Sequence, residues 1–397
     1  MGTTAHPHVA VLMPWPFLTN LLPGSRHGGA GPSSLPQLHT CWDLSRCSTF
    51  TVFIHGYSNA TRSLALRQRE LWPPPPWIRL AASPDEACVV IVPLDSRSHR
   101  IVGRPAAIKS ESSNHPLEAL RQLQGWNGGR NHVVVVRSDR GISRTERFQW
   151  LGCAALAQSH CELDGYAPGF DISLPLSLPS AHRSEYGGIL GLERLEAIAR
   201  SSRPGRPRRY FLTFRGSMYY PSGAERRELL LPLARQSTAE RPVAIFGRCA
   251  GFGHRGAAEL CDALKNASSA APPYLELLNT TFALVPAGES PASMRLPEVL
   301  AAGAVPVFVS GDTASASAYV RPYDEVVPWH EVSLHFPWEA GDSIVRVLER
   351  IPPHKVAKMQ AMAQHVWKQH FRPPNDVATF FSLLEERASF RFRRERR

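Results

Sequence analysis

The chain has 397 residues, of which 43% are hydrophobic and 20% are charged, and its formal net charge is +11. These values exclude a disordered chain, and the length accommodates two domains of ordinary size. The positive charge fits an anionic ligand. The sequence has no RNA- or DNA-binding motif, so we expect no nucleic acid partner.

The first 40 residues are rich in Pro, Gly and His and lack periodicity, which predicts an irregular segment. Residues 9–22 are apolar, but they include two prolines and are too few to span a bilayer. They also lack the basic flank of a signal peptide. We therefore identify no clear targeting segment or membrane anchor.

Three apolar runs follow, at residues 50–54, 89–92 and 133–136, and each has the pattern of a buried strand. Asp95 comes directly after the second run. The carboxyl end of a strand is where α/β proteins place ligand-binding residues, so Asp95 is a candidate site residue. A cap of the following turn explains the same aspartate equally well.

The seven cysteines include two pairs that enclose short loops, Cys41 with Cys47 and Cys249 with Cys261. Such loops are compatible with disulfides formed in an oxidising compartment. Buried free thiols are the alternative. No C-x-x-C pair is present that would suggest zinc. Three N-x-S/T sequons suit a secreted chain and are candidate glycosylation sites: Asn59, Asn266 and Asn279.

A proline-containing stretch at residues 200–208 is the predicted interdomain linker. Buried-strand patterns resume at residues 209–214 and 243–246. Helical periodicity marks residues 354–371, and residues 391–397 form a basic end that we expect to be disordered and solvated.

The stretch between these regions predicts one βαβ unit. Residues 281–285 and 305–309 are buried-strand patterns, and residues 294–302 are apolar on one helical face. Ser293 is the expected N-cap and Gly303 the residue that ends the helix. The two strands should be parallel. The loop after the first strand opens onto a helix N-terminus, where such folds hold phosphates.

Arg295 and Glu298 lie three residues apart on that helix, so they share a face. An arginine there can bind a diphosphate, and a glutamate can accept hydrogen bonds from ribose hydroxyls. A solvated ion pair is the alternative interpretation of the same spacing.

The βαβ stretch resembles the exostosin family, which are inverting glycosyltransferases that include heparan sulfate polymerases and plant cell-wall transferases. Residues 279–288 resemble the family's N-A-T-F-C-L-V-P-x-G, residues 293–300 its S-F-R-F-x-E-A-L, and residues 302–307 its A-G-C-x-P-V. Residues 41–47 and 126–132 resemble the C-F-D-x-x-x-C and W-N-N-G-R-N-H segments. The last two are nearer to the animal exostosins than to the plant members.

The resemblance implies an α/β GT-B fold with two Rossmann-like domains facing a cleft. The terminal helix would cross back onto the first domain, although packing on its own domain is an alternative. From the resemblance, we expect no counterpart of the polymerases' GlcNAc-transferase second domain. The expected parts are an irregular segment 1–40, an acceptor-side domain 41–205, a nucleotide-sugar domain 206–350, terminal helices 351–385 and a basic tail 386–397.

The resemblance also implies roles for individual residues. Plant members have H-D-W-G at the position of residues 138–141, which makes Asp139 the first candidate for the base that deprotonates the acceptor, with Asp95 the second. The F-R-G motif ending at Gly216 would face the donor diphosphate, although Arg215 could also be a surface arginine. The expected UDP-sugar-binding residues are Arg215, Gly216, Ser293, Arg295 and Glu298. Paired cysteines in the family favour Cys41–Cys47 and Cys249–Cys261 disulfides.

We therefore expect transfer of a sugar, with glucuronic acid indicated, from a UDP-sugar to a glycan acceptor in the Golgi, without a cofactor or a metal. One departure weakens this expectation. The animal loop P-R-G-R-R-L-G-S-F-R has lost three basic residues here and contains Glu289, which would repel a diphosphate. The alternative is a catalytically inactive exostosin-like chain that stabilises a homologous active transferase.

Overall fold

The computed structural model describes residues 41–45, 47–57, 74–95, 101, 115–138, 141–176, 189–202, 204–217, 229–230, 232–248, 272–287, 292–310 and 319–395. All of these residues belong to the unit Gln37–Arg397. Six residues with predicted roles lie outside the described ranges, and their predictions stay predictions: Asn59, Asp139, Cys249, Cys261, Asn266 and Glu289.

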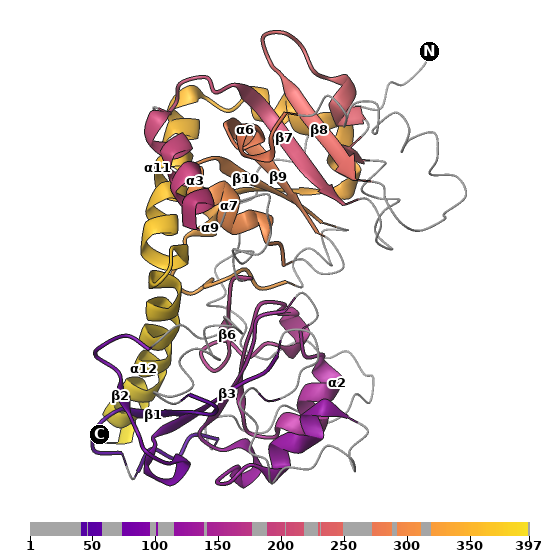
Figure 1. The fold of residues 1–397 in the computed structure, drawn as a ribbon. Coiled ribbons are helices and arrows are strands. Elements are labelled where there is room, and N and C mark those ends of the chain that lie inside the picture. The colour runs from indigo at the N-terminus through magenta and orange to yellow at the C-terminus, as the bar shows by residue number, and fades with distance from the viewer. Residues whose placement is uncertain are drawn as a thin grey trace. The chain divides into compact units, whose positions relative to one another are not determined.

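The first sheet has six parallel strands in the order β2-β1-β3-β4-β5-β6 (Figure 1). Its strands are β1 (Thr51–Ile54), β2 (Arg79–Leu80), β3 (Val89–Pro93), β4 (His132–Val136), β5 (Ala155–Gln158) and β6 (Ile172–Ser173). In register, Val92 pairs with Val134, and Val134 pairs with Leu156. All residues of β3, β4 and β5 are buried, as expected for the centre of a parallel sheet that is covered on both faces.

The second sheet has five parallel strands in the order β11-β10-β9-β7-β8 (Figure 1). Its strands are β7 (Tyr210–Ser217), β8 (Val243–Arg248), β9 (Thr280–Pro286), β10 (Val305–Ser310) and β11 (Leu334–Pro337). Two all-parallel sheets with helices confirm the predicted α/β class and its two Rossmann-like sheets.

Helices complete both halves. They are α2 (Arg144–Glu146), α3 (Ile189–Ser201), α6 (Tyr274–Leu277), α7 (Arg295–Ala301), α9 (Trp329–Val332), α10 (Ile344–Glu349), α11 (Pro353–Val366) and α12 (Asn375–Glu395). In Figure 1, α3, α7 and α11 lie together against the second sheet, and α7 contacts the other two. Within the described residues, no helix is both long enough and apolar enough to cross a bilayer.

The predicted βαβ unit is present as β9, α7 and β10. The strands pair in parallel, with Leu284 opposite Val307. Gly303 ends the helix with a positive φ of 64°, the conformation expected of a glycine in this position. The predicted N-cap is wrong by one residue, because α7 begins after Met294. The Ser293 hydroxyl instead accepts a hydrogen bond from the Arg295 backbone N–H, at 3.3 Å.

The C-terminal helix α12 is longer than the sequence predicts. It extends to Glu395 through residues interpreted above as a disordered end. The reason is local, since no Pro or Gly occurs between Asn375 and Glu395 to stop the helix. Near its start, Asp376 forms a buried 2.9 Å ion pair with Arg137 at the end of β4. The Tyr323 hydroxyl donates to the Asp376 carbonyl at 2.5 Å.

Cys41 and Cys47 are both disulfide-bonded, but the predicted bond between them is wrong. Cys41 pairs with Cys153 and Cys47 pairs with Cys88. The segment runs along the amino ends of the first sheet's strands, and the Asn131 N–H donates to the Cys41 carbonyl. Each thiol therefore lies beside the strand end nearest to it, rather than beside the other thiol. Cys161 is a buried free cysteine.

Candidate functional site

Arg295 is the centre of the candidate site, at the amino end of α7. Its side chain is buried, with 7% of the residue exposed. The guanidinium donates to the Arg215 carbonyl and lies 5.0 Å from the centroid of the Phe214 ring and 5.6 Å from that of Tyr274. Its Nε and Nη2 atoms are buried and have no hydrogen-bond partner among the described residues. Buried charged donors are normally paired, so these two atoms indicate a binding position for an anion.

Arg215 brings a second positive charge to the same place, from the carboxyl end of β7. Its guanidinium lies 5.9 Å from the centroid of the Tyr274 ring, which both arginines therefore share. Within the described structure, the side chain of Arg215 has no hydrogen-bond or ion-pair partner. Two cations near one aromatic ring repel each other, and a bound anion would relieve this repulsion. We call Arg215, Arg295, Tyr274, Phe214 and Glu298 the Arg295 cluster.

Glu298 lies one turn further along α7 and is 3% exposed. The Tyr274 hydroxyl donates to its carboxylate. The alternative of a solvated Arg295–Glu298 ion pair is wrong, since both side chains are buried and the contacts of Arg295 among the described residues do not include Glu298. The carboxylate thus lies within the cluster without a direct ion pair to Arg295.

Gly216 supports the cluster through the absence of a side chain. A Cβ atom at this position would come within 2.6 Å of the Phe214 ring. That ring is one of the two against which the Arg295 guanidinium packs. Gly216, which is predicted to bind the donor, thus leaves room for the ring that positions Arg295.

A neutral histidine of β11, His335, contacts the residue at the carboxyl end of β10. The Ser310 hydroxyl and His335 Nε2 are 2.9 Å apart. Burial, with a smaller contribution from the charge of Arg321, lowers the pKa of His335 to about 4. The imidazole is therefore uncharged at neutral pH. Among the residues that are described, no group of three or more His, Cys, Asp or Glu side chains could hold a metal ion.

The first sheet presents another set of polar residues at its own carboxyl edge. Half-buried Asp95 follows β3 and buried Ser138 follows β4, and the Leu94 N–H donates to the Val135 carbonyl, so these strand ends are adjacent. His55 follows β1, and burial lowers its pKa to about 4. Asp139, the first candidate for the base, comes directly after Ser138, outside the described residues.

The structure thus gathers the predicted donor residues Arg215, Gly216, Ser293, Arg295 and Glu298 into one place and puts Asp95 on the other sheet. Sequence reasoning gave no role to either aromatic ring of the cluster, because Tyr274 carries no motif and Phe214 entered only as the first letter of the F-R-G motif. It also missed the neutral histidines, because their burial follows from packing.

Asn279 lies apart from this cluster, immediately before β9. It is half-buried, and its backbone carbonyl accepts a hydrogen bond from the Tyr210 N–H. The next residue of the sequon, Thr280, is fully buried, and its hydroxyl donates to the Phe282 carbonyl at 2.7 Å.

Comparison with known proteins identifies the family. The Exostosin GT47 domain matches residues 45–351. Exostosin-1c of Danio rerio is 25% identical over 98% of this chain and 54% of its own length, and Exostosin-1 of Bos taurus is 24% identical over 88% and 45%. The chain thus spans about half the length of these curated relatives. A solved glycosyltransferase from Rickettsia africae ESF-5 has a TM-score of 0.40 at 9% identity, covering 87% of this chain and 92% of its own. On the domain match, this chain belongs to the exostosin GT47 family.

Proposed function

We propose that this chain is an inverting glycosyltransferase that binds a UDP-sugar at the Arg295 cluster. The observation that carries the proposal is the buried Arg295 guanidinium with two unpartnered donors beside Arg215. A planar guanidinium matches a diphosphate in both geometry and charge. The position also fits, since ligands of α/β proteins bind outside the carboxyl ends of parallel strands.

The cluster would act on the leaving group. When the bond between the sugar and UDP breaks, negative charge grows on the diphosphate, and fixed positive charges nearby lower the energy of that transition state. Arg215 and Arg295 can supply this stabilisation from the protein itself, which supports a reaction without metal. The Glu298 carboxylate, held by the Tyr274 hydroxyl, would accept hydrogen bonds from the ribose.

The acceptor would be activated from the first sheet. The acceptor hydroxyl attacks the anomeric carbon from the face opposite UDP, so the configuration inverts, and a base removes the hydroxyl proton. Asp139 is the first candidate for that base and Asp95 the second. The proposed acceptor is a glycan, the indicated sugar is glucuronic acid, and the proposed location is the Golgi, in accord with the family resemblance.

A second function has its own supporting observation. Glu289 occupies the loop between β9 and α7, where the animal exostosins have basic residues. A carboxylate near the diphosphate would weaken donor binding. This favours a non-catalytic chain that stabilises a homologous exostosin.

Calorimetric titration of the full chain with UDP and a panel of UDP-sugars, first without metal and then with Mn²⁺, tests both functions. We expect metal-independent binding, with one UDP-sugar preferred. Arg295→Ala should weaken UDP binding by roughly 100-fold or more, because two charged hydrogen bonds are lost. Arg346→Ala, which removes an exposed arginine of α10, is the matched control.

Arg215→Ala provides a second variant that should fold normally, because its side chain is half-buried and has no hydrogen-bond or ion-pair partner among the described residues. It should also weaken UDP binding. Unchanged affinity in both variants would contradict the site assignment. Binding of a UDP-sugar without transfer to any acceptor, or no binding at all, would favour the non-catalytic partner.

A further inference from the structure

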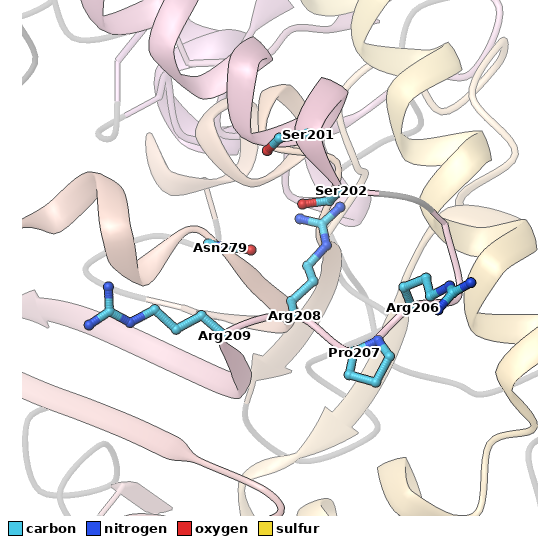
Figure 2. Close-up of a pocket in the computed structure, with 7 residues that line it drawn as sticks. All are labelled: Ser201, Ser202, Arg206, Pro207, Arg208, Arg209 and Asn279. Carbon is cyan, nitrogen blue, oxygen red and sulfur yellow. The ribbon is translucent and has the colours of Figure 1, made fainter.

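A second basic site lies at the opposite end of the second sheet, where strands β7 and β9 begin. Residues 206–209 precede β7, and together with Ser201, Ser202 and Asn279 they line a cavity of about 430 Å³ (Figure 2). Asn279 and Tyr210 are bonded through their backbones at the amino ends of β9 and β7. The Arg295 cluster includes Arg215, which lies on β7 five residues after Tyr210, so roughly 17 Å of strand separates the two places.

The lining is strongly positive. Arg206, Arg208 and Arg209 contribute three guanidinium groups, and among the described residues Glu276 is the one carboxylate bonded to any of them, through Arg209. Arg208 donates to the carbonyls of Ala302 and Gly303, at 2.8 and 2.7 Å, so its charge meets no carboxylate there. Its Nε is buried and has no hydrogen-bond partner within the described ranges.

Some polar side chains that line the cavity are available to bind a ligand. Arg206 is exposed, and neither its guanidinium nor the Asn279 side chain has a hydrogen-bond or ion-pair partner in the described part of the chain. In Figure 2, Arg208 points toward Ser202, while Arg206 and Arg209 extend away from it to opposite sides. The charges are therefore spread along the segment rather than converged on one point.

This arrangement distinguishes between anionic ligands. Charges that diverge along a chain segment suit an extended ligand with repeated anionic groups better than a single phosphate. Hydroxyl and amide side chains between the charges suit sugar hydroxyls. Nucleic acid fits less well, since unpaired bases stack on aromatic rings and the cavity is lined by none. The nearby Tyr210 ring is covered by Arg209, with 5.5 Å between the guanidinium carbon and the ring centroid.

We propose that residues 206–209, with Asn279, form a binding site for an acidic oligosaccharide, separate from the donor site. The inference rests on the proposed function, because a glycan-extending enzyme gains from a second hold on its acceptor or product. A chain bound at the amino edge of the sheet would stay attached between successive transfers at the carboxyl edge.

The test uses the full chain and a pair of octasaccharides that differ only in charge, sulfated dextran and unmodified dextran. Calorimetry at 0.15 M NaCl should detect binding of the sulfated form and none of the neutral form. Arg206→Gln/Arg209→Gln should weaken sulfated dextran binding roughly tenfold, through loss of charged hydrogen bonds. Arg346→Gln, an exposed arginine of α10, should change nothing. UDP affinity should be equal in all three proteins.

Several results would overturn the inference. These are absence of binding to sulfated dextran, equal affinity in the double variant and the unmodified chain, or equal affinity for a single-stranded RNA of the same charge. Inorganic sulfate binding as tightly as the octasaccharide would also overturn it, in favour of a single-anion site. Failure of the proposed function is distinguishable, since it appears as no UDP binding while the difference between the two dextrans persists.

Discussion

Asp171 is the residue whose substitution tests the packing of the first sheet most directly. Its side chain is 1% exposed, and its carboxylate accepts four hydrogen bonds. Two come from the Arg147 guanidinium and one each from the Leu156 and Ala167 N–H groups. The Arg147 side chain is 4% exposed. Asp171→Asn would leave this arginine buried without a counter-charge and would turn an amide N–H toward existing donors.

The expected cost follows from that geometry. Removing one partner of a buried ion pair destabilises a protein by about 3–5 kcal/mol, which is a large share of the roughly 5–15 kcal/mol that stabilises a typical native protein. Arg147→Met/Asp171→Asn should cost less than the sum of the two single changes, because no uncompensated charge remains. Urea unfolding followed by tryptophan fluorescence measures these free energies.

Arg130→Met is the matched control, since this arginine is exposed and its loss should change the unfolding free energy by less than about 0.5 kcal/mol. If Asp171→Asn lowered the unfolding free energy by less than about 1 kcal/mol, the reasoning from buried charge would be refuted. Strict additivity of the two single variants would refute the pairing itself.

Three further predictions concern pH, the cluster and the disulfides. Burial lowers the pKa of both His55 and His132 from 6.5 to about 4, so the unfolded chain takes up protons first and stability should fall as pH drops from 6.5 to 4. The free energy of unfolding, measured at each pH across this range, should depend less steeply on pH in the His55→Asn/His132→Asn variant. An unchanged pH dependence would contradict the role of these two histidines. Gly216→Ala should weaken UDP binding by displacing the Phe214 ring beneath the buried arginine, and it should also lower the melting temperature because that ring is part of the core. Cys47→Ser/Cys88→Ser opens a 41-residue separation and should cost about 4 kcal/mol by chain entropy, and non-reducing peptide maps of the unmodified chain should recover this pair.

The parts of the fold that depend on local pattern were predictable. The apolar runs and the helical period around α7 define the βαβ unit from sequence alone, and the strands have the expected parallel register. The gathering of Arg215 near Arg295 followed from the same topology, because carboxyl ends of parallel strands share one edge.

The parts that depend on distant contacts were not predictable. Cys41 and Cys47 are close in sequence, yet each bonds to a cysteine beside a different strand. Arg137 and Asp376 are 239 residues apart, and no local pattern links them. Tyr274 carries no motif, and its role follows only from the two guanidinium groups that its ring contacts.

The two disulfides cross-link only one end of the first sheet, the end where its strands begin. Cys88 and Cys153 come just before β3 and β5, so both cross-links fasten the amino edge. The carboxyl edge, with Asp95 and His55, carries no cross-link among the described residues. Loops at that edge can therefore change length and sequence without loosening the covalent frame. Such a separation would let the residues at the carboxyl ends of these strands vary while the cross-linked amino ends hold the strands together.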